Sequence, residues 1–129
     1  MEKRIQELLD KYKSYLRSVR KSLTYINDRY GSDSNEYGKE QELQSVILNL
    51  NQLNDNPQDI YGKIKDHIMH YDSLLNYLEG RMEGFKGHWS AKTYRELSGR
   101  AKIVTEIKRD LENLIAVTTP IRRLVVRSQ

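Results

Sequence analysis

IQELLDKYKSYLRSVRKSLTYINDRY, residues 5–30, is the stretch of sequence that decides the fold. Its apolar side chains recur with alternating spacings of four and three residues. A mean spacing of about 3.5 residues is a heptad pattern, which gives a helix one apolar stripe. The pattern therefore predicts a helix over about residues 2–30, ended by turn-forming residues 31–35. The positions that carry the pattern are Ile5, Leu9, Tyr12, Leu16, Val19, Leu23, Ile26 and Tyr30.

The same rhythm returns later in the chain, between Tyr61 and Phe85. It predicts a helix that starts after an Asn56 cap, with Pro57 in the first turn, and stops near Gly84. A shorter amphipathic helix is expected over about residues 39–53. Another is expected from a Ser90 cap to about residue 118. No internal repeat is evident, since two heptad helices are what any helical bundle shows.

These segments predict an all-α fold, namely an elongated four-helix, mainly antiparallel bundle with heptad, coiled-coil-like packing. Residues 1–119 are expected to form a single helical bundle domain, followed by a short basic and apolar tail over residues 120–129. The second helix, at about 22 Å, would be too short to cover the groove between helices of roughly 40 Å. We therefore expect an uncovered apolar strip that a partner or a second copy covers.

The composition excludes several classes of protein. The chain has 129 residues and no cysteine, so disulfides and thiolate metal sites are ruled out. No apolar run approaches the length of about 18 residues that a membrane span needs. The first residues show no apolar signal core, and we expect a cytoplasmic protein that binds no membrane.

Charge is distributed unevenly along the chain. Residues 1–30 hold eight basic and four acidic side chains, residues 31–60 hold one and six, and residues 90–129 hold nine and four. The simplest interpretation is internal, with an acidic second helix lying against a basic first and last helix. The external alternative is a basic face that binds an acidic partner.

Candidate chemistry is sparse. His67 and His70 lie three residues apart beside Asp66 and Asp72, but no His-Glu-x-x-His or Glu-x-x-His pattern accompanies them. No nucleophile–base arrangement or phosphate-binding loop is recognisable. We therefore expect no metal, no cofactor, no small-molecule ligand and no enzymatic activity.

One motif points elsewhere. Arg81 and His88 have the R-x6-H spacing and resemble the ribonuclease motif of the HEPN family of helical bundles. The resemblance implies that the two side chains act on an RNA phosphodiester, usually across a dimer. It covers eight residues, and Met82 stands where the family usually has a polar residue. An HEPN-like ribonuclease is the third alternative for function.

The function that we expect is a non-enzymatic protein–protein interaction module, an adaptor, regulator or inhibitor of a larger bacterial or phage assembly that also self-associates. Its contact residues would be aromatic and basic, the types enriched at protein interfaces. The alternative is a nucleic-acid-binding bundle that uses the basic faces of the first helix and of the C-terminal tail for phosphate contacts. The predicted partner-binding residues are Phe85, Trp89, Arg122, Arg123 and Arg127, and the predicted nucleic-acid-binding residues are Lys13, Arg17, Arg20 and Lys21.

Overall fold

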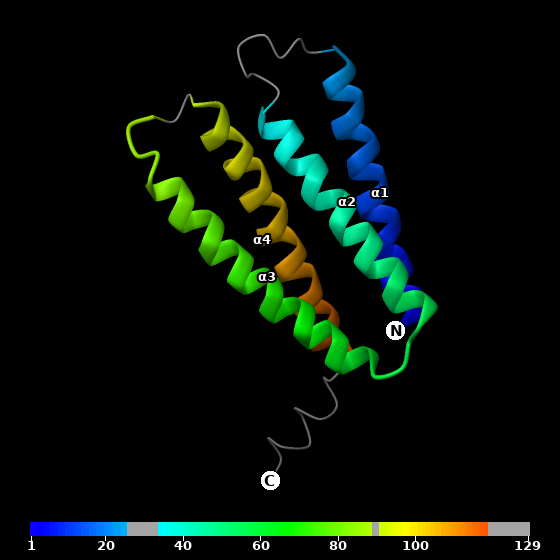
Figure 1. Cartoon of the computed structure of the whole chain (residues 1–129). Coiled ribbons are helices and arrows are strands. Elements are labelled where there is room, and N and C mark those ends of the chain that lie inside the picture. Colours follow the sequence, from blue (N-terminus) through cyan, green and yellow to red (C-terminus); the bar gives the residue numbers. More distant parts are fainter. Residues whose placement is uncertain (26–33, 89–90, 119–129) are drawn as a thin grey trace.

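The computed structural model describes residues 1–25, 34–88 and 91–118, which form four α-helices and, within these ranges, no strand (Figure 1). The helices are α1 (Glu2–Tyr25), α2 (Ser34–Asp55), α3 (Ile60–Glu83) and α4 (Lys92–Thr118). The predicted all-α helical bundle is therefore confirmed. The last ten residues, the predicted tail, lie outside the described residues.

The stripe that the heptad pattern predicts in α1 faces the core. Its members from Ile5 to Val19 are at most 8% exposed, and Leu23 is half-buried. Ile26 and Tyr30, which continue the pattern, lie outside the described residues, as does the predicted extension of the helix to residue 30. The core residues of α1 are Ile5, Leu9, Tyr12, Leu16 and Val19.

Helix α2 is longer than the sequence pattern predicts. It has 22 residues, against 24 in α1 and 24 in α3, and so measures about 33 Å. The sequence pattern predicts that the helix starts near residue 39, but it starts at Ser34. Its first turn is held against α4, because Asn35 Nδ2 donates a hydrogen bond of 3.2 Å to the Arg95 carbonyl. The expected apolar strip rested on a short second helix, and that length mismatch does not exist.

The start of α3 also differs from the prediction. Asn56 and Pro57 belong to the connection rather than to the helix, and Asp59 occupies the cap position in the left-handed conformation, with a φ of 51°. No side-chain hydrogen bond caps this end. The other end is as predicted, because Gly84 caps α3 and donates its N–H to the Arg81 carbonyl at 3.1 Å. The predicted Ser90 cap of α4 lies outside the described residues.

Helices α2 and α4 touch through their backbones at two glycines. A Cβ atom on Gly38 would lie 2.1 Å from the Glu96 carbonyl oxygen, and one on Gly99 would lie 2.0 Å from the Asn35 carbonyl oxygen. Any larger residue would therefore force the two helices apart. Helix α2 packs chiefly on α4 and α1, and α3 packs chiefly on α4, so the α2–α4 contact is the centre of the bundle.

The two helix pairs, α1–α2 and α3–α4, correspond residue by residue. Positions in α2 match positions 61 residues later in α4, and positions in α1 match positions 59 residues later in α3. The glycine contact obeys the same relation, since Gly38 meets Glu96 as Gly99 meets Asn35. The matching core positions include Ile5 and Ile64, Tyr12 and Tyr71, Leu43 and Val104, Val46 and Ile107, Leu50 and Leu111, and Leu53 and Leu114.

We predict that Gly38→Ala and Gly99→Ala each lower the free energy of unfolding by about 3 kcal/mol, because the new methyl group meets a carbonyl oxygen that belongs to the facing helix backbone. Gly80→Ala is the matched control. A Cβ at Gly80 meets nothing within 4 Å, so this variant should gain roughly 0.5–1 kcal/mol of helix propensity. Urea titration followed by circular dichroism measures both effects. Equal stability of all three variants would contradict the contact.

Candidate interaction surface

Part of the uneven charge along the chain is neutralised by ion pairs between helices of the bundle. Arg20 Nε of α1 pairs with Glu40 Oε2 of α2 at 3.2 Å, and Arg100 Nε of α4 pairs with Glu42 Oε1 of α2 at 2.9 Å. Glu42 is only 4% exposed, so Arg100 provides the partner that a buried carboxylate requires. The prediction that an acidic second helix lies against basic first and last helices is confirmed at these two contacts.

A second polar contact, the Tyr12 cluster, joins α1 to α4. It consists of Tyr12, Lys11 and Asp110. The Tyr12 hydroxyl donates to Asp110 Oδ2 at 2.5 Å, Lys11 Nζ approaches the same oxygen at 2.5 Å, and the Lys11 ammonium lies 5.3 Å from the centre of the Tyr12 ring. Burial raises the pKa of Tyr12, and the hydrogen bond and negative charge of Asp110 raise it further. Tyr12 therefore stays protonated as a hydrogen-bond donor.

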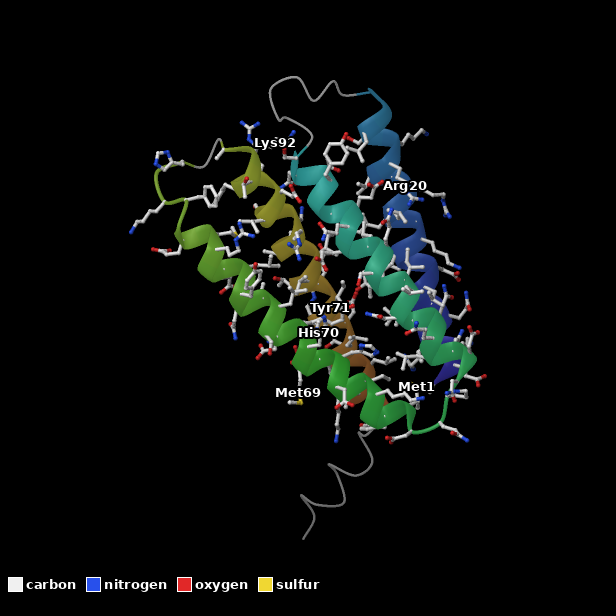
Figure 2. All side chains as sticks on the ribbon, viewed as in Figure 1. Met1, Arg20, Met69, His70, Tyr71 and Lys92 are labelled. Atoms are coloured by element: carbon white, nitrogen blue, oxygen red, sulfur yellow. The ribbon has the colours of Figure 1, made fainter. Side chains whose placement is uncertain are left out.

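The Tyr71 cluster, formed by Tyr71, Asn49 and His70, joins α3 to α2. Asn49 Nδ2 donates to the Tyr71 hydroxyl at 3.0 Å, and the His70 ring packs edge-on against the Tyr71 ring at 5.3 Å (Figure 2). Burial raises the pKa of Tyr71 to about 12, against a smaller lowering effect of the Asn49 hydrogen bond. The three residues occupy the positions that correspond to Tyr12, Asp110 and Lys11.

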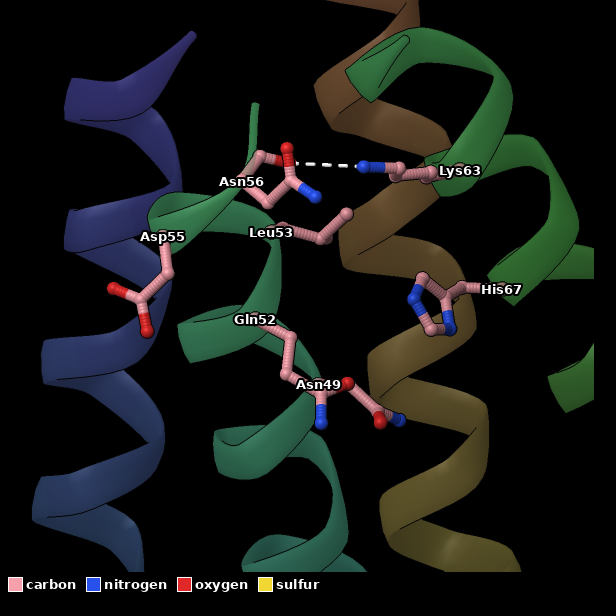
Figure 3. Close-up of a pocket in the computed structure, with 7 residues that line it drawn as sticks. All are labelled: Asn49, Gln52, Leu53, Asp55, Asn56, Lys63 and His67. Atoms are coloured by element: carbon pink, nitrogen blue, oxygen red, sulfur yellow. Dashed lines mark hydrogen bonds between the residues drawn. The ribbon is translucent and has the colours of Figure 1, made fainter. Parts of the chain in front are cut away.

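A groove lies beside each cluster. The α2/α3 groove has a volume of about 410 Å³, and in it Leu53 and His67 point toward each other while Asp55 points away (Figure 3). The α1/α4 groove has a volume of about 280 Å³. Five lining positions correspond under the two offsets. In the order α1/α4 then α2/α3 they are Arg4 and Lys63, Leu8 and His67, Asp110 and Asn49, Asn113 and Gln52, and Leu114 and Leu53.

The α2/α3 groove is lined mostly by residues with polar side chains, but the surface that they expose to it is mainly apolar and carries little charge. Lys63 Nζ donates to the Asn56 carbonyl at 2.9 Å, and burial lowers the pKa of His67, with repulsion from His70 adding to the effect. Among the described residues, no group of three or more His, Asp or Glu side chains could hold a metal ion. The groove therefore offers amide and imidazole hydrogen-bonding groups around the Leu53 side chain.

Exposed apolar side chains gather on the same two helices. Among the described residues, the large exposed apolar side chains are Leu48 at 59%, Met69 at 68%, Tyr77 at 55% and Tyr37 at 43%, all on α2 or α3. These four residues define what we name the α2/α3 face. The sequence analysis missed them, because only the internal correspondence makes them unusual. Their counterparts are Arg109 for Leu48, Asp10 for Met69, Ser18 for Tyr77 and Ser98 for Tyr37.

The predicted partner-binding residues are only partly visible. Phe85 follows the end of α3, is half-buried against the core and donates its backbone N–H to the Met82 carbonyl at 2.9 Å. It lies on the same helix pair as Met69 and Tyr77. The other predicted residues, Trp89, Arg122, Arg123 and Arg127, lie outside the described residues.

The predicted nucleic-acid-binding residues all lie exposed on α1. Arg20 is bound to Glu40, and Lys21 also has an interaction partner. Lys13 and Arg17 have no hydrogen bond or ion pair within the described part of the chain, so they are the two that can contact an external phosphate.

The residues of the R-x6-H motif do not form a pair in the single chain. Arg81 Nη1 lies 3.5 Å from the Tyr77 hydroxyl, to which it donates, and the guanidinium lies over the Tyr77 ring at 6.0 Å. The backbone N–H of His88 donates to the Phe85 carbonyl at 2.7 Å. Both side chains are exposed, and within the described ranges no hydrogen bond joins them.

Among the described residues, no helix combines the length and the apolar character that a bilayer span requires. Comparison of the chain with protein-family models, curated proteins and solved structures gives no match. The surfaces described above are therefore the basis for assigning a function.

We predict that alkaline pH weakens the fold through Tyr71. The unfolded chain releases this proton near the ordinary pKa of 10.0 and the folded chain near 12. Stability is therefore complete below pH 10 and should fall by about 1.4 kcal/mol per pH unit between pH 10 and 12. Tyr12, whose pKa burial also raises, contributes a decline of the same sign. Tyr71→Phe should therefore reduce the slope in urea titrations without abolishing it, whereas Tyr77→Phe, at an exposed position, should leave it unchanged. Equal slopes in both variants would rule out the role of Tyr71.

Proposed function

We propose that the chain is a non-enzymatic protein–protein interaction module, an adaptor, regulator or inhibitor of a larger bacterial or phage assembly, that also self-associates. The observation that carries the proposal is the α2/α3 face, with Leu48, Met69, Tyr77 and Tyr37 exposed. Exposed apolar side chains are individually common on monomers, and their concentration on two of four helices is what requires an explanation.

The internal correspondence supplies a control for this argument. At the matching positions of the other two helices the chain has Asp10, Ser18, Ser98 and Arg109. Polar residues therefore satisfy the fold at these sites, and the apolar residues on α2 and α3 are not needed for packing. Their presence is explained by contact with a protein surface.

The surroundings of the face suit a partner helix or loop. Several apolar side chains of α3 are only half-buried, so a partner lying beside α3 would cover more apolar surface than the four exposed residues alone. Tyr77 stacks with Arg81, and these two residue types are enriched at interaction hot spots. The half-buried group on α3 comprises Ile60, Ile68, Leu74, Leu75 and Met82, and Phe85 follows just after the helix.

The proposal includes the finer architecture expected from the sequence, an elongated and mainly antiparallel bundle with heptad packing. Two contacts support it. Arg20, late in α1, meets Glu40, early in α2, whereas Gln6, early in α1, accepts a hydrogen bond from Asn54, late in α2, at 3.3 Å. Such a rod would present the α2/α3 face along its length.

We predict that replacing exposed apolar residues by their counterparts, as Leu48→Arg, Met69→Asp and Tyr77→Ser together, leaves the fold intact and removes binding. Sedimentation velocity would show loss of self-association, and affinity capture from the native host would show loss of the co-purifying protein. The control is Lys102→Gln with Arg109→Gln on exposed positions of α4, which should retain both. Unchanged association of the triple variant would contradict the proposal.

A second candidate function is nucleic-acid binding. The observation in its favour is α1, which carries seven basic and three acidic residues and leaves Lys13 and Arg17 without partners within the described part of the chain. Surface cations give salt-dependent affinity for phosphates.

We predict for this second candidate that Lys13→Gln with Arg17→Gln weakens retention on single-stranded and double-stranded DNA alike. The slope of log affinity against log salt should fall by roughly one to two units, because each phosphate contact contributes about 0.7–0.9 units. Fluorescence anisotropy at several salt concentrations measures the slope. The variant avoids Arg20, whose loss would leave Glu40 unpaired. An unchanged slope would remove α1 as a nucleic-acid surface.

A further inference from the structure

The correspondence between the two helix pairs extends from the core to polar contacts. It includes the two glycines whose missing Cβ atoms let α2 and α4 touch, and it includes the carbonyl that each of them meets. It includes a buried tyrosine on α1 and on α3, each 1% exposed. Matching apolar positions alone are weak support for a duplication, since the helices of every bundle share such a pattern. Matching backbone contacts and matching polar partners are independent of it.

The two tyrosine clusters share the placement of their side chains but differ in the direction of the hydrogen bond, since the Tyr12 hydroxyl donates to Asp110 and the Tyr71 hydroxyl accepts from Asn49. Each hydroxyl meets the side chain at the same position of the facing helix, Asp110 in one case and Asn49 in the other. Each ring contacts the side chain that precedes the tyrosine. Lys11 Nζ lies 5.3 Å from the centre of the Tyr12 ring, and the centres of the His70 and Tyr71 rings are 5.3 Å apart. A groove with five corresponding lining positions lies beside each cluster.

We infer that the chain is a duplicated helix pair, a covalently joined dimer whose halves pack about an approximate two-fold axis at Gly38 and Gly99, and that Tyr71, Asn49 and His70 are the second copy of the Tyr12, Asp110 and Lys11 site. The two copies have diverged in charge. The first copy holds a carboxylate that both Tyr12 and Lys11 contact, and the second holds an amide bonded to the Tyr71 hydroxyl and an imidazole packed against the Tyr71 ring. His70 occupies the position that corresponds to Lys11. A cation at residue 70 should therefore be able to pair with a carboxylate at residue 49.

Because the two copies carry different side chains, the two grooves differ in which hydrogen-bonding groups they leave available. In the α1/α4 groove, Asp110 is occupied by Tyr12 and by Lys11, so its hydrogen-bonding capacity serves the fold. In the α2/α3 groove, Asn49 makes one contact to Tyr71, and no ion pair crosses the groove within the described residues. The second copy therefore leaves a larger and less charged opening, on the helices that also carry the exposed apolar residues.

The test rebuilds the first copy at the second site. Asn49→Asp alone places a carboxylate beside Tyr71 with no cation opposite it, which should lower the urea midpoint. Adding His70→Lys should recover most of that loss, with a coupling of roughly twofold to fivefold in the unfolding constant, as for partly exposed ion pairs. The matched control is Asn49→Asp with Met69→Lys, which adds the same charge one residue away, on the exposed face of α3.

Equal rescue by His70→Lys and Met69→Lys, or rescue by neither, would overturn the inference, because the two sites would then not share a geometry. A coupling confined to His70→Lys supports it even if Asn49→Asp alone leaves stability unchanged.

A reciprocal variant, Asp110→Asn, keeps a hydrogen-bonding side chain beside Tyr12 and converts the first site toward the second. Ultraviolet titration should then show Tyr12 ionising at lower pH than in the parent chain, toward the range of Tyr71. An unchanged titration of Tyr12 would count against the equivalence.

Discussion

The close contact between the α2 and α4 backbones is the constraint on which the rest of the structure depends. Because Gly38 and Gly99 carry no side chain, the backbones of α2 and α4 touch at these two positions and form the centre of the bundle. Helix α1 then packs mainly on α2, and α3 mainly on α4. Each outer helix reaches its second neighbour through the hydroxyl of a buried tyrosine, and α1 adds the contact of Lys11 with Asp110. The grooves beside those tyrosines follow from this geometry.

The polar contacts are arranged around that centre in a way that explains the uneven charge of the chain. Carboxylates on α2 accept contacts from Arg20 on one side and Arg100 on the other. A further ion pair, between Lys108 and Asp72 at 2.9 Å, joins α4 to α3. The basic ends and the acidic second quarter of the sequence are thus partly complementary to each other. What remains for an external partner is concentrated in exposed cations of α1 and in the apolar residues of the α2/α3 face.

Apolar periodicity, as heptads in two segments and as amphipathic stripes in two others, was enough to predict four helices and the buried stripe of α1. Glycine capping predicted the end of α3 near Gly84. Periodicity could not predict the true start of α2, because the first turn of that helix is stabilised by a contact from Asn35 to α4. It also missed the correspondence between the helix pairs. The matching residues are mostly similar rather than identical, as with Val46 and Ile107, and they are recognised by shared contacts. The α2/α3 face stands out only once that correspondence is known.

The short connection over residues 56–59 affects which substitutions the two halves could tolerate during evolution. A link of four residues holds the partners at an effective concentration on the order of millimolar, so that their association is intramolecular. Two separate subunits that associate in dilute solution tolerate little loss of affinity between their surfaces. Tethered halves tolerate much more, and one of them can give up a stabilising charge pair without dissociating. The tether, which includes the left-handed Asp59, thereby frees one side of the molecule to acquire a new task.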